Sequence, residues 1–239
     1  TLDRSSAASD VYKRQDRYLR TIFDLDEDHV TPRRARISAR LGHSKSAVSQ
    51  KIEYMRLAGL VQMTDDRRIV LTEIGHRTAV ALTRRHRLSE RMLVDIIGIR
   101  RTDAHQLATR WEHVMDDKVE RRLVPLLGYP ATDSWGNPIP GLEQIGFAPT
   151  PVHHSIPVPE MPLDLPTTCV IRRFTEHIQD HPDVLAGLLD QGIEPGVEIT
   201  ATAKKKSVCL ATSRDTAELP TAIACAIHVD ARPSTQRVN

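Results

Sequence analysis

The chain has 239 residues, of which 40% are hydrophobic and 27% are charged, and its formal net charge at pH 7 is +2. This length suggests two or three compact units, and the apolar share is large enough for buried cores. No apolar run approaches the length of a membrane span, and Cys169, Cys209 and Cys225 show no close pairing. Composition therefore argues against a membrane protein, a membrane partner and a disulfide scaffold, and it favours a reducing cytoplasm.

The N-terminal residues divide into a leader and a first helix. Residues 1–15 are polar and lack hydrophobic periodicity, so we expect a disordered or non-native leader. Helical spacing begins with Tyr18, Leu19 and Ile22.

Two more helices and a hairpin are predicted next. A second helix is expected to begin near Thr31-Pro32 and to stop at Gly42, after which Ser44 caps a third helix. Two alternating apolar runs around Asp65-Asp66 predict a β-hairpin. Three short helices followed by a hairpin form a winged helix-turn-helix.

The predicted winged helix carries a local positive charge. Between His29 and Ala58 there are seven Lys or Arg residues against the single acid Glu53. Because the third helix of such modules enters the DNA major groove, its early positions are expected to face base edges: Ser44, Lys45, Ser46, Ala47, Ser49 and Gln50. The basic residues expected at phosphates are Arg34, Arg36, Lys51 and Arg67. A basic bundle without a DNA partner is the alternative.

Histidine and glutamate residues then gather on two predicted helices. Read as one helix, residues 104–127 place His105, Thr109, Glu112 and His113 within an arc of roughly 100°. Upstream, His86 and Glu90 stand one helical turn apart. Imidazole and carboxylate groups suit divalent transition metals such as Fe, Mn, Co, Ni and Zn. The alternative is a charged rim on two surface helices.

The C-terminal part changes character. Residues 145–166 are rich in proline and lack periodicity, so an extended linker is expected. Residues 168–230 contain short β-rich runs separated by turn residues, as in a small barrel.

Taken together, these stretches resemble the diphtheria toxin repressor and iron-dependent regulator family of metal-activated transcription repressors. The resemblance rests on YLRTIFDL, TPRRARISARLGHS, AVSQ, RRHRLSERMLVDIIGI, RWEHVMDDKVERRL, GNPIPGL and RRFTEHIQ. It implies a homodimer and a mainly α fold with β structure: a winged helix-turn-helix, a helical dimerisation and metal domain, and a C-terminal SH3-like small β-barrel. The boundaries we expect are 1–15 leader, 16–80 winged helix, 81–144 helical domain, 145–166 linker, 167–230 SH3-like domain and 231–239 tail.

The resemblance also implies two metal sites. The ligands of an ancillary site would be His86, Glu90, His105, Glu176 and Gln179. For the primary, activating site Glu112 and His113 match, but Arg17 stands where the family has Met and Thr109 where it has Cys or Glu. Thr109 can still offer a carbonyl or hydroxyl oxygen, whereas Arg17 adds a cation that never ligates metal.

We therefore expect a cytoplasmic, non-enzymatic repressor that binds a double-stranded DNA operator of metal-homeostasis genes. Its corepressor would be Fe²⁺ or Mn²⁺, with Zn²⁺, Co²⁺ and Ni²⁺ also binding in vitro. One alternative is a winged-helix regulator with a degenerate primary site that responds to another effector. Another is a metallohydrolase, which the absence of an HExxH helix disfavours.

Overall fold

The computed structural model describes residues 2–151 and 154–231, with the side chains of residues 15–151 and 154–230. The chain divides into two compact units, which are described separately. Unit 1 contains residues 1–89, 108–126 and 140–149, and unit 2 contains residues 90–107, 127–139 and 150–239. The predicted helical region 81–144 thus contributes segments to both units. No described helix is long and apolar enough to cross a membrane.

The first helix, α1, spans Leu2–Glu27. We expected residues 1–15 to be a disordered or non-native leader; residues 2–15 are helical, so disorder is wrong for them, and their being non-native stays a prediction. A lack of hydrophobic periodicity does not prevent a helix here. Once the helix around Tyr18 has formed, adding residues to its end does not require another nucleation step.

The next two helices, α2 (Arg34–Leu41) and α3 (Lys45–Leu57), form the predicted helix-turn-helix. Gly42 ends α2 at φ +67°, in the left-handed region that glycine adopts without strain. Ser44 then caps α3, because its side-chain oxygen accepts a hydrogen bond from the Ala47 backbone N–H at 3.2 Å. The start of α2 differs from the expectation by about one half-turn, since its N-cap is Arg33.

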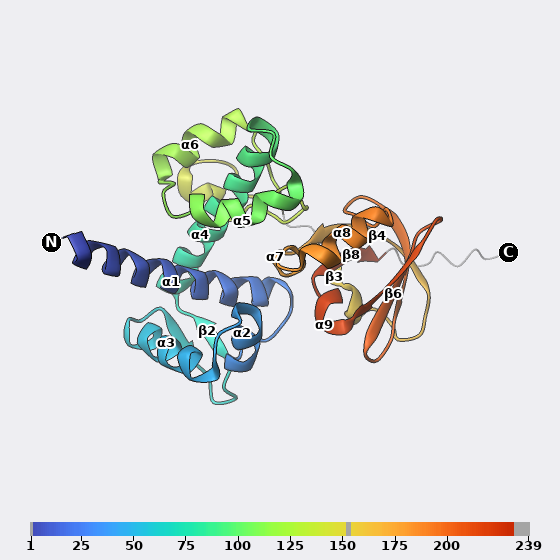
Figure 1. Cartoon of the computed structure of the whole chain (residues 1–239), viewed down its shortest axis with the longest axis horizontal. Helices are drawn as coiled ribbons and strands as arrows, with labels where there is room; N and C mark the ends of the chain where they lie inside the picture. The colour runs from blue at the N-terminus through green and yellow to red at the C-terminus, as the bar shows by residue number, and fades with distance from the viewer. Residues whose placement is uncertain (1, 152–153, 232–239) are drawn as a thin grey trace. The chain divides into compact units, whose positions relative to one another are not determined.

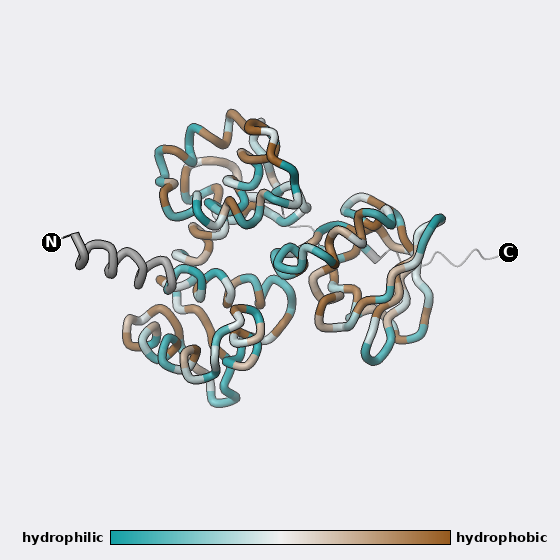
Figure 2. Tube along the Cα trace, viewed as in Figure 1, coloured by the Kyte–Doolittle hydropathy of each residue, from teal (hydrophilic) through white to brown (hydrophobic). Residues whose placement is uncertain are grey.

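The wing is a two-stranded antiparallel hairpin of β1 (Val61–Met63) and β2 (Ile69–Leu71). Figure 1 shows α2 and α3 against α1, and Figure 2 shows hydrophobic stretches recurring along these helices. The core residues that hold this region together are Tyr18, Leu19, Ile22, Leu25, Ile37, Leu41, Val48, Ile52, Met55, Val61, Ile69, Ala79 and Leu82. The predicted winged helix is confirmed.

After the wing comes α4 (Glu73–Arg91), followed by a π-helical turn at Met92–Ile96. The Thr72 hydroxyl accepts a hydrogen bond from the Gly75 N–H at 3.1 Å and donates one to the Gly59 carbonyl at 2.7 Å. Through these two hydrogen bonds, Thr72 joins the first turn of α4 to Gly59, which follows α3.

The stretch predicted as one helix over residues 104–127 is two helices, α5 (Arg101–Trp111) and α6 (Asp117–Leu126). The Asp116 carboxylate accepts hydrogen bonds from the Lys118 and Val119 N–H groups, at 2.9 and 3.0 Å. This cap starts a new helix. The single predicted helix is therefore wrong, and Glu112 and His113 lie in the turn just beyond α5, where the Glu112 N–H still donates to the Ala108 carbonyl at 2.9 Å.

The proline-rich segment is also more ordered than expected. A short 3₁₀ turn forms at Leu142–Ile145, strand β3 at Ile156–Pro157 and another 3₁₀ turn at Val158–Glu160. Strand β3 pairs with the last described strand, which includes Val229, and Val158 is fully buried. The expectation of an extended linker over 145–166 is thus wrong for these residues, since proline suits an edge strand.

Unit 2 is built on a six-stranded antiparallel sheet in the order β3-β8-β4-β5-β6-β7. Its other strands are β4 (Thr167–Phe174), β5 (Glu198–Ala203), β6 (Ser207–Ala211), β7 (Thr216–Pro220) and β8 (Ile227–Ala231). Helices α7 (Glu176–Gln179), α8 (Pro182–Asp190) and α9 (Thr221–Ala224) connect them. The expected small C-terminal β domain is present as this sheet, and residues 232–239 of the predicted tail lie outside the described residues.

Candidate DNA interface and metal centres

The residues predicted to face base edges lie at the start of α3. Ser44, Lys45, Ser46, Ala47 and Gln50 are exposed, and Ser49 is half-buried. The side chains of Ser44 and Ser46 are 3.2 Å apart and hydrogen-bonded. Small side chains along this edge would let α3 approach the floor of a DNA groove closely. Among these residues, Gln50 has the longest neutral polar side chain, and it is exposed.

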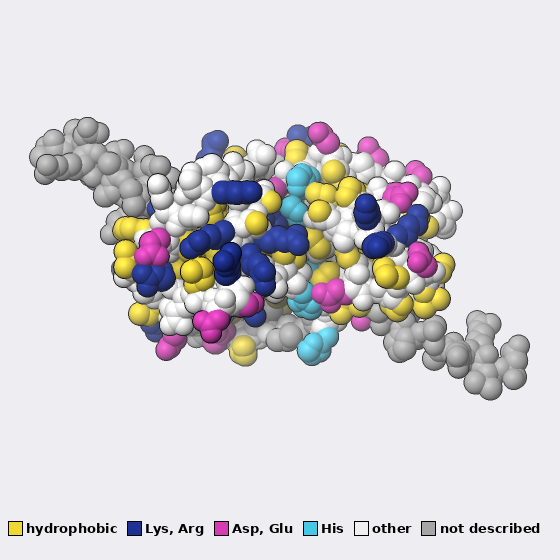
Figure 3. All heavy atoms as spheres, turned by 90° about the horizontal axis from the view of Figure 1, so that it is seen from below, with side chains coloured by type: hydrophobic (Ala, Val, Ile, Leu, Met, Phe, Trp, Pro, Cys, Tyr) yellow, Lys and Arg dark blue, Asp and Glu magenta, His cyan; other side chains and the backbone are white. Residues whose placement is uncertain are grey.

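The basic residues around α3 fall into two groups. Arg33, Arg56 and Arg68 form ion pairs with Asp66, Glu53 and Asp26. In contrast, among the described residues Arg34, Arg36, Lys45 and Arg67 make no hydrogen bond or ion pair through their side chains. The side chains of this second group are exposed and can contact an outside anion. Figure 3 shows Lys and Arg side chains gathered on one face of the molecule.

Two surface hollows lie within this region. One, of about 640 Å³, is lined by Ser44, Ala47, Gln50 and Lys51 among others. The other, of about 550 Å³, is lined by Arg33, Arg34, Ala35, Met63 and Arg67, from the start of α2 and the wing. Three guanidinium groups around one hollow suit a phosphate group.

In unit 2, two of the predicted metal ligands meet. His105 Nδ1 lies 2.8 Å from Glu90 Oε1, and both side chains are buried. On the other ring nitrogen, His105 Nε2 lies 3.6 Å from Asp180 Oδ1, a carboxylate that the sequence analysis did not single out. An imidazole ring between two carboxylates can either bind a second proton or, with the carboxylates, bind a divalent metal ion.

Glu176 and Gln179 open and close the short helix α7, and each is only 4% exposed. The Gln179 amide nitrogen donates to the Phe174 carbonyl at 3.5 Å. Its amide oxygen, however, is buried and has no hydrogen-bond partner among the described residues. An orphaned buried carbonyl oxygen is costly unless something else satisfies it, and a metal ion can do so.

In unit 1, Glu112 is the centre of a buried charge cluster. Its Oε2 atom forms an ion pair with Arg20 of α1 and lies 2.6 Å from His86 Nδ1. Arg20 Nη1 is also 2.6 Å from His86 Nδ1. Burial alone would raise the pKa of Glu112, but the positive charge of Arg20 and the His86 hydrogen bond outweigh it, so the pKa is lowered.

The other carboxylate oxygen of Glu112 faces His113. Glu112 Oε1 lies 3.6 Å from His113 Nε2, and Asp16 Oδ2 lies 3.4 Å from His113 Nδ1. Thr109, on α5, is half-buried, whereas Arg17 is exposed. The helix α1 therefore directs Asp16 and Arg20 toward the predicted primary ligands, while the guanidinium of Arg17 reaches solvent.

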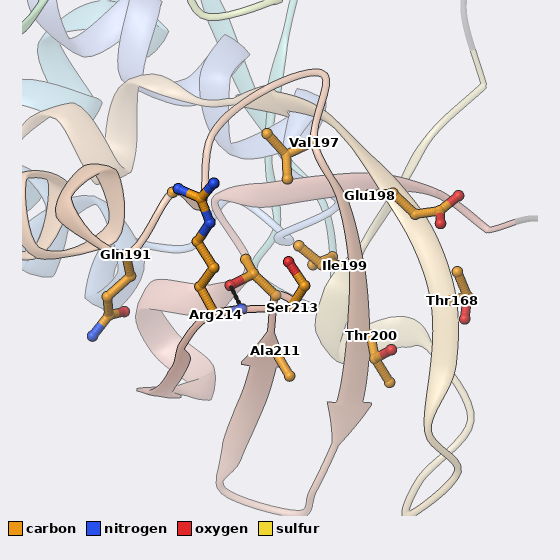
Figure 4. Close-up of a pocket in the computed structure, with 11 residues that line it drawn as sticks. Thr168, Gln191, Val197, Glu198, Ile199, Thr200, Ala211, Ser213 and Arg214 are labelled. Carbon is orange, nitrogen blue, oxygen red and sulfur yellow. Dashed lines mark hydrogen bonds between the residues drawn. The ribbon is translucent and has the colours of Figure 1, made fainter.

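A separate hollow lies at one end of the C-terminal sheet. It has a volume of about 580 Å³ and is lined by hydroxyl and amide side chains with Arg214 and Glu198. Figure 4 shows Arg214 and Glu198 pointing to different sides of it. It contains one carboxylate and no imidazole, and none of the predicted site residues lines it.

The chain matches two domains that are characteristic of one protein family. The N-terminal DNA-binding domain of iron-dependent repressors matches residues 10–69, and their metal-binding and dimerisation domain matches residues 72–141. Together they cover more than half of the chain. The chain belongs to the iron-dependent repressor family. It is therefore a metal-dependent, DNA-binding transcriptional repressor with a dimerisation domain, and the metallohydrolase alternative is set aside because this family consists of repressors.

Similar proteins extend this family assignment to the C-terminal part. The iron-dependent repressor IdeR of Mycobacterium leprae is 39% identical over 227 residues, covering 93% of this chain and 99% of that protein. The diphtheria toxin repressor of Corynebacterium diphtheriae is 38% identical over 224 residues, covering 92% and 98%. IdeR of Mycobacterium tuberculosis is 46% identical over 186 residues, covering 77% and 81%.

Solved structures agree with the fold. A manganese-dependent transcriptional repressor in complex with manganese has a TM-score of 0.74 at 27% identity and covers 91% of this chain and 100% of its own. The IdeR of T. acidophilum has a TM-score of 0.72 at 26% identity, covering 91% and 97%. These likenesses support a three-part member of the iron-dependent repressor family.

Three residues of this repressor were missed by the sequence analysis: Asp16, Arg20 and Asp180. Helical spacing gave no signal for Arg20, because this residue lies about 100° around the helix from Leu19 and about 160° from Ile22, away from the predicted apolar face. Arg20 is 8% exposed. A buried guanidinium needs a carboxylate partner, but the sequence alone does not say which one.

Proposed function

We propose that this repressor is activated by Fe²⁺ or Mn²⁺ and controls metal-homeostasis genes from the cytoplasm, binding duplex operators as a homodimer. Membership in the iron-dependent repressor family supports this proposal. Similar proteins are named as iron-dependent repressors, and one similar structure contains manganese. Zn²⁺, Co²⁺ and Ni²⁺ would bind the same donors in vitro, because imidazole and carboxylate ligands accept all of them.

The observation that carries the proposal is the buried contact between Glu90 and His105, together with the unsatisfied amide oxygen of Gln179. We assign the ancillary metal to His86, Glu90, His105, Glu176 and Gln179. His86 stands one turn before Glu90 on the same helix α4, so both can face one ion. Two imidazoles, two carboxylates and one amide oxygen fit a borderline divalent ion and disfavour a soft one.

The primary metal would be held by Glu112 and His113, with an oxygen of Thr109 as a third donor. All three residues belong to unit 1. The lowered pKa of Glu112 favours its ionised carboxylate, which is the form that binds metal. A bound divalent ion would hold these side chains together through its positive charge. Glu112 and His113 also contact α1, and α1 packs against the helix-turn-helix. Ligation energy would thereby favour the DNA-competent arrangement.

At the DNA, we assign base contacts to Ser44, Lys45, Ser46, Ala47, Ser49 and Gln50, and phosphate contacts to Arg34, Arg36, Lys51 and Arg67. The exposure of most of these side chains and the absence of internal ion pairs at Arg34, Arg36 and Arg67 among the described residues support the assignment.

The experiment is a selection from a library of random duplexes by the full chain, made in parallel with Mn²⁺, with Fe²⁺ under anaerobic conditions, and with a chelator. We expect an enriched, two-fold symmetric sequence in the two metal arms and none with chelator, because a dimer binds paired half-sites. Enrichment of the same sequence in all three arms would contradict metal activation. It would favour the alternative of a regulator that responds to another effector.

A further inference from the structure

Helix α1 presents two charged side chains to the donors of the primary site. Asp16 and Arg20 are four residues apart, so they lie on the same face of α1. Asp16 Oδ2 lies 3.4 Å from His113 Nδ1, and Arg20 pairs with Glu112. One helix thus contacts both of the predicted primary ligands, through residues that are themselves not in the predicted ligand set.

The two ring nitrogens of His113 have different neighbours. Nδ1 faces the Asp16 carboxylate, and Nε2 lies 3.6 Å from Glu112 Oε1. Two donors that each bind one transition-metal ion at about 2.0–2.2 Å lie about 3 Å or slightly more apart. Nε2 of His113 and Oε1 of Glu112 are therefore close to the separation that a shared ion requires, whereas Nδ1 is directed elsewhere.

Glu112 is oriented in the same manner. Its Oε2 atom is engaged by Arg20 and by His86 Nδ1, so Oε1 is the oxygen that faces His113. The side chains of Glu112 and Arg20 are 3% and 9% exposed, so water screens their attraction poorly. Arg20 consequently fixes which carboxylate oxygen is available to an ion, although its charge also opposes the approach of that ion.

We propose that Asp16 is a positioning residue for the primary metal, a role that rests on the proposed metal activation. Its Oδ2 atom, 3.4 Å from Nδ1, is placed to accept the Nδ1 proton of His113 after a small rotation of either side chain, which would hold the ring in the tautomer whose Nε2 lone pair is free for metal. Ligating histidines commonly donate their second N–H to a carboxylate, which orients the ring and makes it a stronger donor. Asp16 acts through His113 and does not itself touch the metal.

This role matters more here than in a site with more donors. The family Met and Cys positions are Arg17 and Thr109 in this chain, so Glu112 and His113 contribute most of the binding. Arg17 is exposed, and the neighbouring Asp16, with a side chain 27% exposed, is the residue of this pair that faces the donors. A site with few ligands depends strongly on the orientation of each.

The test compares Co²⁺ binding by the full chain, followed by visible absorption, with Asp16→Ala, Asp16→Glu and Asp26→Asn. We expect Asp16→Ala to weaken one class of sites by about 10–100-fold, the usual cost of losing such a partner. Asp16→Glu should restore most of the affinity. Asp26→Asn is the matched control, because Asp26 is on the same helix but pairs with Arg68.

A second readout needs no metal. Long-range nitrogen–proton NMR of histidine-labelled protein reports which ring nitrogen of His113 is protonated, with His113→Gln used to assign the signal. We expect the Nδ1–H form in the wild type and a shift toward the Nε2–H form in Asp16→Ala. A structural role for Asp16 would leave the tautomer unchanged.

The outcomes separate this inference from the proposed function. If His113→Gln removes a class of Co²⁺ sites that Asp16→Ala leaves intact, the inference is wrong and the primary site stands. If His113→Gln removes no class of sites, the primary site assigned under the proposed function is wrong, and the inference is overturned with it.

Discussion

Gln50 is the exposed side chain at the start of α3 that is best suited to read a base. Its amide can donate and accept at once, which matches the N6 and N7 edge of adenine. The neighbouring Lys51 is half-buried, and its ammonium group lies 5.3 Å from the centre of the Tyr54 ring, so the ring holds it near the surface of α3. We therefore assign sequence preference to Gln50 and general affinity to Lys51.

The substitution Gln50→Ala should cost about 1–3 kcal/mol of binding free energy on the selected operator and relax its sequence preference. Lys51→Ala should weaken binding to the operator and to random duplexes alike. It should also reduce the slope of the logarithm of the binding constant against the logarithm of salt concentration by about one, as expected for one lost phosphate contact. Binding isotherms at several salt concentrations measure both effects. Equal losses for Gln50→Ala on operator and random DNA would refute its assignment to a base.

The junction between the wing and α4 depends on a close backbone approach. Gly75 lies in the first turn of α4, and a Cβ atom added there would collide with the carbonyl oxygen of Leu60. The Thr72 backbone N–H also donates to that oxygen at 3.0 Å. A side chain at position 75 must therefore move backbone atoms of the junction.

We expect Gly75→Ala to lower the free energy of unfolding by about 1–3 kcal/mol, the usual cost of overpacking. Gly187→Ala is the matched control, because Gly187 is also helical, in α8, and an added Cβ would meet nothing within 4 Å. That control should be neutral or stabilise by about 0.5–1 kcal/mol. Denaturant unfolding of both variants measures the difference, and equal effects would contradict the proposed junction.

Local signals predicted the elements whose ends are set by neighbouring residues. Ser44 and Gly42 marked the boundaries of α2 and α3, because capping depends on residues within one turn. The break after Trp111 was missed, because helical spacing continued across it while Asp116 began a new helix. Pairing of β3 with β8 was missed because the partner strand lies about 70 residues away, at Ile227–Ala231.

The predicted metal ligands show the same division. Spacing along α4 correctly placed His86 and Glu90 one turn apart, and resemblance supplied Glu176 and Gln179, whose ligation stays a prediction. The contacts of Asp16 with His113 and of Arg20 with Glu112 join residues more than 90 positions apart. Periodicity carries no information about such pairs, so only the folded structure reveals them.

At the scale of the whole molecule, metal binding and DNA binding are proposed to be thermodynamically linked. If metal raises the affinity for operator, operator must raise the affinity for metal by the same factor. Buried Glu90 is central to this linkage, because its carboxylate contacts His105 and lies one turn from His86 on α4. Removing only its charge should weaken the metal site while keeping its shape.

The most direct measurement is a Mn²⁺ titration of operator binding by the wild type and by Glu90→Gln. The duplex is the one selected with metal, and binding is followed by fluorescence anisotropy. We predict chelator-reversible activation of the wild type. For Glu90→Gln we predict activation at metal concentrations at least about tenfold higher, since even an outer partner of a ligand contributes that much. Operator binding of equal strength with Mn²⁺ and with chelator would contradict metal activation, and identical titrations of the two proteins would contradict the assignment of Glu90.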